Sequence, residues 1–208
     1  MDKTAVILAA GSFPTNKIPL SILKEAEFLC CCDGAAQELI RSGLCLPDAI
    51  VGDGDSLPEA FKEQYNDILH LISEQDDNDL TKATRFCISQ GYTRITYLGT
   101  MGRREDHAIG NFALLMHYFR DLHIHPTFVT DYGIFHACQG RATFATTPRQ
   151  QVSIFNYSCT RLSGTGFRWE PYAFEHLWQG TLNEATCDTV SLDGDGAYTV
   201  YIAYERKA

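Results

Sequence analysis

Two aspartates separated by one glycine, Asp53 and Asp55, stand directly after a short apolar run at residues 49–51. If this run is a strand that continues in extended form, residues two apart point to the same side, with Cα atoms roughly 7 Å apart. At ~4 Å, two bare carboxylates repel by about 4 kcal/mol at an effective dielectric of about 20. Mg²⁺ would relieve this repulsion, because it binds one or two carboxylates and takes further ligands from substrate phosphates. A plain Asp-Gly turn is the alternative interpretation.

The elements that must position these acids alternate regularly along the first part of the chain. Strands are predicted at 4–8, 28–32, 49–51, 68–72, 94–98 and 127–130, and helices at 18–26, 35–42, 58–65, 80–90 and 107–120. Strict alternation predicts an α/β fold with a mainly parallel sheet and helices on both faces. In such sheets ligands bind outside the carboxyl ends of the strands.

Acids recur at these strand ends. Asp33 follows the second predicted strand, Asp53 and Asp55 the third, Asp79 the fourth and Asp106 the fifth. We therefore expect carboxylates remote in sequence to meet at one edge of the sheet. For Asp33 and Asp79, helix N-capping is the alternative interpretation.

Cations stand close to two of these acids. Lys82 falls in the first turn of a predicted helix, on the unfavourable side of the helix dipole, and a phosphate bound at that terminus would account for it. Arg103 and Arg104 precede Asp106, and arginine matches the geometry of phosphate oxygens. A surface ion-pair cluster is the alternative. The sequence contains no G-x-x-x-x-G-K-[ST] phosphate-binding loop.

The C-terminal part of the sequence is rich in predicted strands. They lie at 133–138, 141–146, 151–157, 166–169, 186–191 and 198–204, with a turn at 192–196. This pattern is typical of a small antiparallel β-sandwich or barrel. We therefore expect an α/β domain over residues 1–131 and a smaller β-sandwich domain over 132–208.

Composition narrows the partners. The 208 residues carry a formal charge of −9, which argues against nucleic acid and anionic lipid as partners but not against nucleotides. No apolar run is long enough to cross a membrane, and no cleaved signal is visible, so a cytoplasmic location is expected. The eight cysteines show no C-x-x-C spacing and are expected to be buried, reduced thiols.

With these residues in view, the sequence resembles the thiamine pyrophosphokinase family over nearly its whole length. The family's D-G-G-A-N corresponds to D-G-A-A-Q at 33–37, and its P-D-x-x-x-G-D-x-D-S is matched in full at 47–56. Its D-F-T-K appears as D-L-T-K at 79–82, and its G-G-R-x-D-H as G-R-R-E-D-H at 102–107. The order and spacing of four motifs make the resemblance specific.

The resemblance implies an enzyme that transfers the pyrophosphoryl group of ATP to the hydroxyl of thiamine, giving thiamine diphosphate and AMP with Mg²⁺. It also implies an α/β catalytic domain, a β-sandwich that helps to hold thiamine, and a homodimer with active sites between subunits. The metal ligands would be Asp33, Asp53, Asp55 and Asp79. The catalytic residues would be Asp79, Lys82, Arg104 and Asp106, with Lys82 and Arg104 neutralising phosphate charge and Asp106 positioning thiamine. The cofactor-binding residues would be Asp33, Gly34, Gln75, Asn78, Thr81 and Asn183.

The sequence departs from the family pattern at several positions. Ala35 and Arg103 stand where the family has glycine, and Gln37 stands where it has asparagine. Leu182 replaces a serine that commonly touches thiamine, so no polar contact is expected there. Trp169 is a candidate for stacking on thiamine, with burial in the core as the alternative.

Two other functions compete with this one. In the first, Asp53-Gly54-Asp55 is the metal-binding D-x-D of a sugar-nucleotide glycosyltransferase, which leaves Lys82 and Arg104 without a role. In the second, the chain binds thiamine or a nucleotide without catalysis, an interpretation that rests on Leu182 alone.

Overall fold

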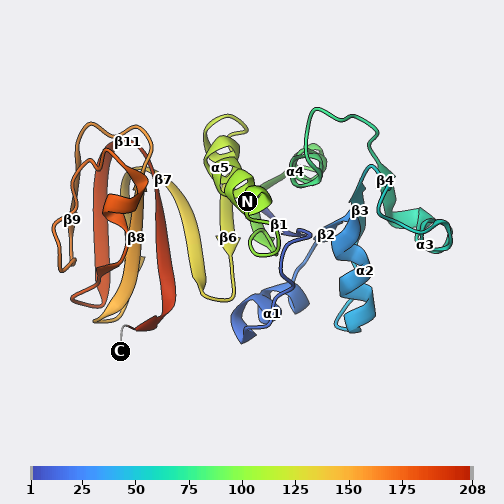
Figure 1. The fold of residues 1–208 in the computed structure, drawn as a ribbon, viewed down its shortest axis with the longest axis horizontal. Coiled ribbons are helices and arrows are strands. Elements are labelled where there is room, and N and C mark those ends of the chain that lie inside the picture. The colour runs from blue at the N-terminus through green and yellow to red at the C-terminus, as the bar shows by residue number, and fades with distance from the viewer. Residues whose placement is uncertain (1, 207–208) are drawn as a thin grey trace. The chain divides into compact units, whose positions relative to one another are not determined.

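The computed structural model describes residues 2–206 and divides the chain into two units, Met1–Asp131 and Tyr132–Ala208. Each unit has strands of its own, and Figure 1 shows both as a ribbon. Within the described residues, we find no helix that combines the length and the apolar character needed to cross a bilayer.

The first unit contains a six-stranded sheet whose neighbouring strands are all parallel. The strands are β1 (Lys3–Leu8), β2 (Leu29–Cys32), β3 (Ala49–Gly52), β4 (Leu69–Leu71), β5 (Tyr92–Leu98) and β6 (His125–Val129), in the order β4-β3-β2-β1-β5-β6. Every residue of β2 and β3 is buried, as expected for strands covered on both faces.

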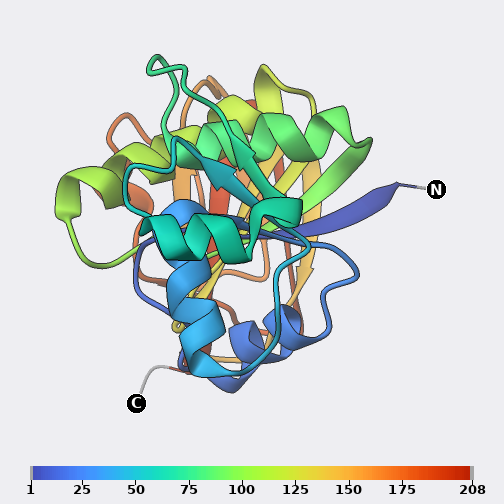
Figure 2. The ribbon, with the colours of Figure 1, turned by 90° about the vertical axis from the view of Figure 1, so that its right-hand side faces the viewer.

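Helices cover both faces of this sheet. They are α1 (Lys17–Lys24), α2 (Asp33–Ser42), α3 (Glu59–Gln64), α4 (Asp79–Ser89) and α5 (Glu105–Arg120), and a short 3₁₀ helix (Asn66–Ile68) precedes β4. Helices α1 and α2 lie on one face, and α4 and α5 lie on the other (Figures 1 and 2). The predicted α/β class, with a parallel sheet between two helical layers, is confirmed.

The strand order creates a switch point between β1 and β5. The chain leaves β1 towards β2 on one side of the sheet and leaves β5 towards β6 on the other side. Loops that diverge in this way leave a crevice outside the carboxyl ends of the two strands, which is the usual ligand site in open α/β sheets. Gly11 and Ser12, after β1, bond to the backbone of Gly99 and Met101, after β5.

The second unit is antiparallel and is built on two long strands, β7 (Gly133–Ala145) and β11 (Thr189–Arg206). The second half of β11 also pairs with β8 (Gln150–Asn156), and its first half pairs with β9 (Leu162–Thr165). Strand β10 (Asn183–Glu184) adds to β8, and a 3₁₀ helix, η2 (Leu177–Gly180), precedes it. Side chains from the first half of β11, such as Leu192, and from β8, such as Ile154, share one core, as in a sandwich.

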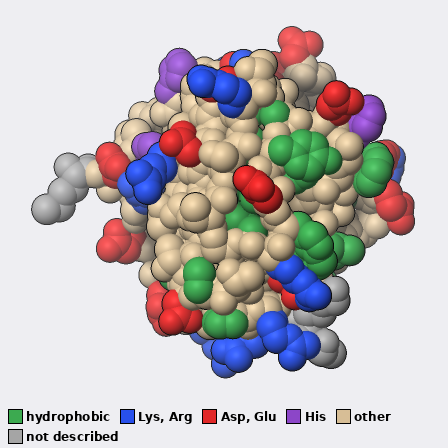
Figure 3. Space-filling model, turned by 90° about the vertical axis from the view of Figure 1, so that its left-hand side faces the viewer, with side chains coloured by type: hydrophobic (Ala, Val, Ile, Leu, Met, Phe, Trp, Pro, Cys, Tyr) green, Lys and Arg blue, Asp and Glu red, His purple; other side chains and the backbone are tan. Residues whose placement is uncertain are grey.

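Three local predictions in this unit are wrong. Residues 192–196 are not a turn between strands but a part of β11, where a register shift between Gly194 and Ala197 absorbs the glycines. The strands predicted at 133–138 and 141–146 form one strand, with Gly140 at a positive φ of 70°. Residues 166–169 are not a strand; Phe167 makes an isolated bridge to Ala185. Figure 3 shows apolar and charged side chains interspersed on one face of the molecule.

Candidate active site

Asp33 is a buried carboxylate at the carboxyl end of β2. It is the first residue of α2 and is 2 % exposed, and its Oδ2 accepts a hydrogen bond of 2.6 Å from the amide of Gly54. Its Oδ1 is buried and has no hydrogen-bond partner among the described residues. The capping interpretation is wrong, because the residues at the N-caps of α2 and α4 are Cys32 and Asn78.

Asp53 and Asp55 lie in a turn that follows β3, so the expected extended continuation of the strand is wrong. The backbone amide of Asp55 donates to Asp53 Oδ1 at 3.0 Å, and Gln75 Nε2 approaches Asp53 Oδ2 at 3.4 Å. Gly54 between them has a positive φ of 79°, which a residue with a side chain adopts at a cost. The glycine therefore folds the turn back so that its own amide reaches Asp33.

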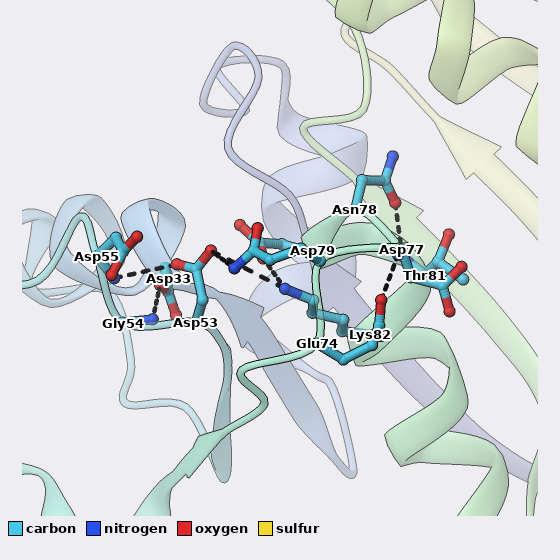
Figure 4. A network of polar contacts seen from close by, with 11 residues as sticks. Asp33, Asp53, Gly54, Asp55, Glu74, Asp77, Asn78, Asp79, Thr81 and Lys82 are labelled. Carbon is cyan, nitrogen blue, oxygen red and sulfur yellow. Dashed lines mark hydrogen bonds and ion pairs between the residues drawn. The ribbon is translucent and has the colours of Figure 1, made fainter.

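Lys82 carries the buried cation of the site. Its side chain is 2 % exposed, and its Nζ lies 3.6 Å from Asp79 Oδ1 and 3.9 Å from Asp53 Oδ2. Asp53 lies in the loop after β3 and Asp79 is the first residue of α4, so Lys82 joins two parts of the edge (Figure 4). A buried ammonium with carboxylates on two sides balances part of their charge.

The surroundings shift the pKa values of these acids in opposite directions. Burial raises the pKa of Asp33, which the Gly54 amide partly offsets and the charge of Asp79 reinforces. Burial also raises the pKa of Asp79, together with the charge of Asp53 and against that of Lys82. The amide of Asp55 lowers the pKa of Asp53. A further positive charge beside Asp33 and Asp79 would favour their ionised forms and lower both pKa values.

Arg104 and Asp106 form a two-pronged ion pair at the start of α5. Arg104 Nε and Nη2 lie 3.1 and 2.6 Å from the two carboxylate oxygens, and both side chains are exposed. The hydrogen bonds from Arg104 lower the pKa of Asp106. The carboxylate therefore stays ionised, and as a weak base it is suited to accept a hydrogen bond rather than to remove a proton.

A pocket of 360 Å³ opens at the switch point of the sheet. Its walls come from the loop after β1, the turn after β5 and the N-terminal turns of α4 and α5. Asp79, Asn78 and Arg104 line it, so the predicted edge of the sheet and the pocket share residues. The other acids, Asp33 and Asp53, adjoin it through Lys82 and Asp79.

Two of the residues predicted to bind a cofactor, Gly34 and Asn78, lie at the starts of helices α2 and α4. Gly34 lies in the first turn of α2, where an added Cβ would only touch Ala10 and Ser56 at ordinary distances. Asn78 caps α4 by accepting from the amide of Thr81 at 2.9 Å. Asn78 therefore fixes the start of α4 beside the pocket, and Gly34 leaves space at the start of α2.

Thr81 points away from the pocket. It is 3 % exposed, and its hydroxyl lies 2.9 Å from that of Tyr118, while the next turn pairs Thr84 with Tyr97 at 3.0 Å. These hydroxyl pairs anchor α4 to α5 and β5. Thr81 thus fixes the helix that carries Lys82.

Asn183 lies in the second unit, in β10. It is buried, and its side chain bonds the backbone of Trp169 on both its oxygen and its nitrogen, at 3.2 and 2.7 Å. Trp169 is 49 % exposed, which goes against its burial in the core, and Leu182 is exposed with a positive φ of 62°. Asn183 therefore holds the backbone of an accessible tryptophan in place.

The structure adds two pocket residues that were not among the predicted site residues. Thr100 and Asn111 line the pocket, and Asn111 Nδ2 donates to the Thr100 carbonyl at 2.8 Å. The Thr100 hydroxyl oxygen is buried without a partner among the described residues. Ala9 and Ala10 after β1 also line the pocket, and their small side chains let a ligand approach the backbone.

The carboxylates suit a hard divalent cation that is shared with a phosphate. Within residues 2–206, no three His, Cys, Asp or Glu side chains form a ready-made metal cage. Mg²⁺ does not require one, because it keeps waters and is bound by one or two carboxylates together with substrate phosphates. The unpartnered Asp33 Oδ1 and the raised pKa of Asp79 fit such an ion.

Gly52 is needed for the placement of Asp33. A Cβ added at Gly52 would collide with the Asp33 carboxylate. We expect Gly52→Ala to displace this carboxylate, to weaken magnesium-dependent nucleotide binding, and to destabilise the fold by about 1–3 kcal/mol through overpacking. Urea denaturation and calorimetric titration with an ATP analogue measure the two effects.

Gly110→Ala is the matched control for this substitution. Nothing lies within 4 Å of a Cβ at Gly110, which is inside α5. We expect this variant to be as stable as the parent or more stable by up to about 1 kcal/mol. Unchanged stability and nucleotide binding in Gly52→Ala would show that Asp33 does not depend on Gly52.

Comparisons with known proteins agree on one family. The model described as "Thiamin pyrophosphokinase, catalytic domain" matches residues 20–125, and that described as "Thiamin pyrophosphokinase, substrate-binding domain" matches residues 133–201. Among curated proteins, none matches the chain significantly.

Solved structures show the same fold. Thiamine pyrophosphokinase from Bacillus subtilis is 19 % identical with a TM-score of 0.79, covering 98 % of this chain and 100 % of that one. The Candida albicans enzyme is 18 % identical with a TM-score of 0.77, covering 97 % and 90 %. The yeast enzyme is 14 % identical with a TM-score of 0.75, covering 97 % and 86 %.

Proposed function

This chain belongs to the thiamin pyrophosphokinase family, and we propose that it carries out the family's reaction at the carboxyl edge of its parallel sheet. It is a thiamine diphosphokinase, in which ATP supplies the pyrophosphoryl group and thiamine accepts it. The products are thiamine diphosphate and AMP.

The reaction makes one bond and breaks another at the β-phosphorus of ATP. The hydroxyl oxygen of thiamine forms the new bond, the oxygen bridging the α- and β-phosphates leaves with AMP, and the hydroxyl proton is released. Positioning and charge stabilisation supply most of the catalysis in phosphoryl transfer. The residues of this chain therefore act mainly by positioning the substrates and by stabilising the phosphate charge.

One observation carries the placement of the site. Asp33, Asp53 and Asp79 follow three different strands, yet all lie around or beside the buried ammonium of Lys82, next to the switch-point pocket. A cluster of carboxylates with one buried cation is costly without a ligand that uses it. A divalent cation would balance the carboxylates, and the triphosphate bound with it would balance the ammonium of Lys82.

We assign Asp33, Asp53, Asp55 and Asp79 as the residues that would hold Mg²⁺. When bound, the ion would neutralise part of the phosphate charge of ATP. Lys82 adds a fixed positive charge at the same place, and its burial keeps that charge in a low-dielectric environment. The pocket at the switch point would receive the rest of the nucleotide.

Arg104 and Asp106 are proposed to act as a pair. Arg104 lines the pocket, where its guanidinium would stabilise phosphate oxygens. Asp106, held ionised by Arg104, would accept a hydrogen bond from the thiamine hydroxyl and so align its oxygen. This assigns Asp106 to orientation of the nucleophile.

The second unit is proposed to contribute to thiamine binding in a homodimer with active sites between subunits. Its exposed apolar side chains, Trp169, Trp178 and Leu182, suit contact with a ligand ring or a partner surface. A cytoplasmic location is proposed as well, because Cys30, Cys31 and Cys32 are buried thiols of the kind found in reducing compartments.

A product assay tests the function. Purified protein incubated with ATP, Mg²⁺ and thiamine is expected to release AMP and thiamine diphosphate in equal amounts. Omission of Mg²⁺ with added chelator should abolish both products. Release of ADP in place of AMP would refute pyrophosphoryl transfer, and thiamine binding without turnover would favour the non-catalytic alternative.

A further inference from the structure

Arg103 occupies an unfavourable backbone conformation at the rim of the pocket. Its φ is 57°, in the left-handed region that residues with a Cβ avoid. Other non-glycine residues with positive φ among residues 2–206 are His123, Arg149 and Leu182, and of these four Arg103 is the one that lines the switch-point pocket. Such strain is tolerated where side-chain contacts hold the residue in place.

The side chain of Arg103 makes those contacts. Its Nη1 donates to the Ala10 carbonyl at 3.0 Å, and its Nη2 donates to Glu38 Oε2 at 2.6 Å. Ala10 belongs to the loop after β1, and Glu38 belongs to α2. One guanidinium thus ties together two segments that are remote from its own turn.

The loop after β1 is packed closely against the turn that carries Arg103. Gly11 N donates to the Gly99 carbonyl at 2.7 Å, and Ser12 N donates to the Met101 carbonyl at 2.8 Å. Gly102 lies so near Ser12 that an added Cβ would collide with it. The two loops therefore stabilise each other's conformation, and the hydrogen bond from Arg103 to Glu38 connects them to α2.

Two arginines line the pocket, and each is paired with a carboxylate outside the lining, Arg103 with Glu38 and Arg104 with Asp106. Arg103, Arg104 and His107 line the pocket, with Asp79 as the acid among its lining residues, in a chain of formal charge −9. Glu38 holds Arg103 in one orientation without entering the lining itself. Ion pairs therefore fix the orientation of both guanidinium groups at the pocket.

We propose that Arg103 is a positioning residue that sets the affinity of the pocket for ATP by holding the loop after β1, the turn after β5 and α2 in place. The inference rests on the proposed function, because the nucleotide is the ATP of that reaction. Arg103 contacts protein groups and not the reacting atoms, so its contacts favour ground state and transition state equally. Interactions of this kind change KM and leave kcat nearly constant.

Arg103→Gly tests the proposal without endangering the fold. Glycine adopts positive φ readily, so the turn keeps its conformation while the two side-chain bonds are lost. Calorimetric titration uses Mg²⁺ with α,β-methylene ATP, whose methylene bridge replaces the bond that the reaction breaks. We expect the Kd of this analogue and the KM for ATP to rise about tenfold, the effect of losing roughly one charged hydrogen bond, with kcat within about twofold.

Two further variants change the contact between Arg103 and Glu38 only in part, and a smaller rise in the Kd of the analogue is expected for each. Arg103→Lys retains a cation that can reach one of the two acceptors, and it should recover part of the lost affinity. Glu38→Gln retains a neutral acceptor, and it should raise the Kd less than Arg103→Gly does. A purely structural role would lower the amount of folded protein and would not separate KM from kcat.

Arg149→Gly is the matched control. Arg149 is another arginine at positive φ, 71°, and it lies in the second unit between β7 and β8. We expect its replacement to leave the Kd of the analogue unchanged. An equal loss of affinity in Arg149→Gly and Arg103→Gly would overturn the inference.

The inference and the proposed function fail in different ways. Wild-type affinity in Arg103→Gly, or a lower kcat at constant KM, would overturn the role of Arg103. Analogue binding by the parent protein without formation of AMP and thiamine diphosphate would refute the function. The ratio of the two Kd values would still decide the role of Arg103.

Discussion

Lys82→Met is expected to lower kcat by about two to three orders of magnitude, comparable to the loss of one preorganised charge-stabilising group. Lys82 is 2 % exposed and lies 3.6 Å from Asp79 and 3.9 Å from Asp53. Its fixed charge lies where phosphate charge is proposed to accumulate. Methionine fills a similar volume without that charge.

The same substitution should not unfold the protein. Burying an ammonium ion carries a desolvation cost, which the substitution removes, and loss of one partner of an ion pair is strongly destabilising where the charge left behind is buried. Asp79 and Asp53 retain 40 % and 23 % side-chain exposure, so water screens their repulsion after the cation is removed. We expect the urea midpoint of Lys82→Met to equal or exceed that of the parent.

Steady-state formation of thiamine diphosphate at saturating ATP, Mg²⁺ and thiamine measures the effect. Lys24→Met, an exposed lysine in the last turn of α1, is the control and should keep the parent kcat. A kcat for Lys82→Met within about threefold of the parent, less than about 1 kcal/mol of barrier, would remove Lys82 from the reaction.

Asp55→Asn is expected to reduce turnover at least about a hundredfold, because an amide cannot replace the charge of a carboxylate beside Mg²⁺. The side chain of Asp55 is exposed, and the part of the residue that supports the fold is its backbone amide, which donates to Asp53. Asparagine keeps that amide. Thermal unfolding of the variant should therefore match that of the parent.

Asp67→Asn provides the comparison for this variant. Asp67 is also exposed, but it lies in the 3₁₀ helix before β4, away from the carboxyl ends of the strands. It should keep full activity. If both variants turned over substrate at the parent rate, Asp55 would have no part in holding the ion.

Much of the site follows from sequence because its acids stand at strand ends. Asp33 and Asp53 each come directly after a buried run, and a parallel sheet brings the ends of such runs to one edge. The position of Lys82 also points to the site, because a cation in the first turn of a helix is unfavourable unless an anion compensates for it. The order of residues along the chain places these groups at one edge whichever strands are neighbours.

The pocket could not be predicted in the same way. Its position depends on β1 and β5 being neighbours, and nothing in either strand's sequence specifies that pairing. Thr81 shows a second limit, because its hydroxyl turns to Tyr118 in the core although its neighbours face the site. Side-chain direction on a helix depends on what packs against each face.

Long strands account for the errors in the second unit. The glycines and aspartates at 192–196 are typical of a turn, but β11 passes through them by a bulge while keeping β7 as its partner. Pairing with a neighbouring strand over many residues outweighs a local preference for a turn. A sequence window of a few residues does not contain that partner.

The central claim is that carboxylates from separate loops meet at one edge of the sheet to hold a divalent cation with a triphosphate. Electron paramagnetic resonance of Mn²⁺, in the presence of α,β-methylene ATP, counts ions bound to the protein. The parent protein should bind Mn²⁺ together with the nucleotide more tightly than the nucleotide alone does, and Asp55→Asn should lose this gain. Equal Mn²⁺ binding by the parent and Asp55→Asn, or no binding beyond that of the nucleotide itself, would contradict the account.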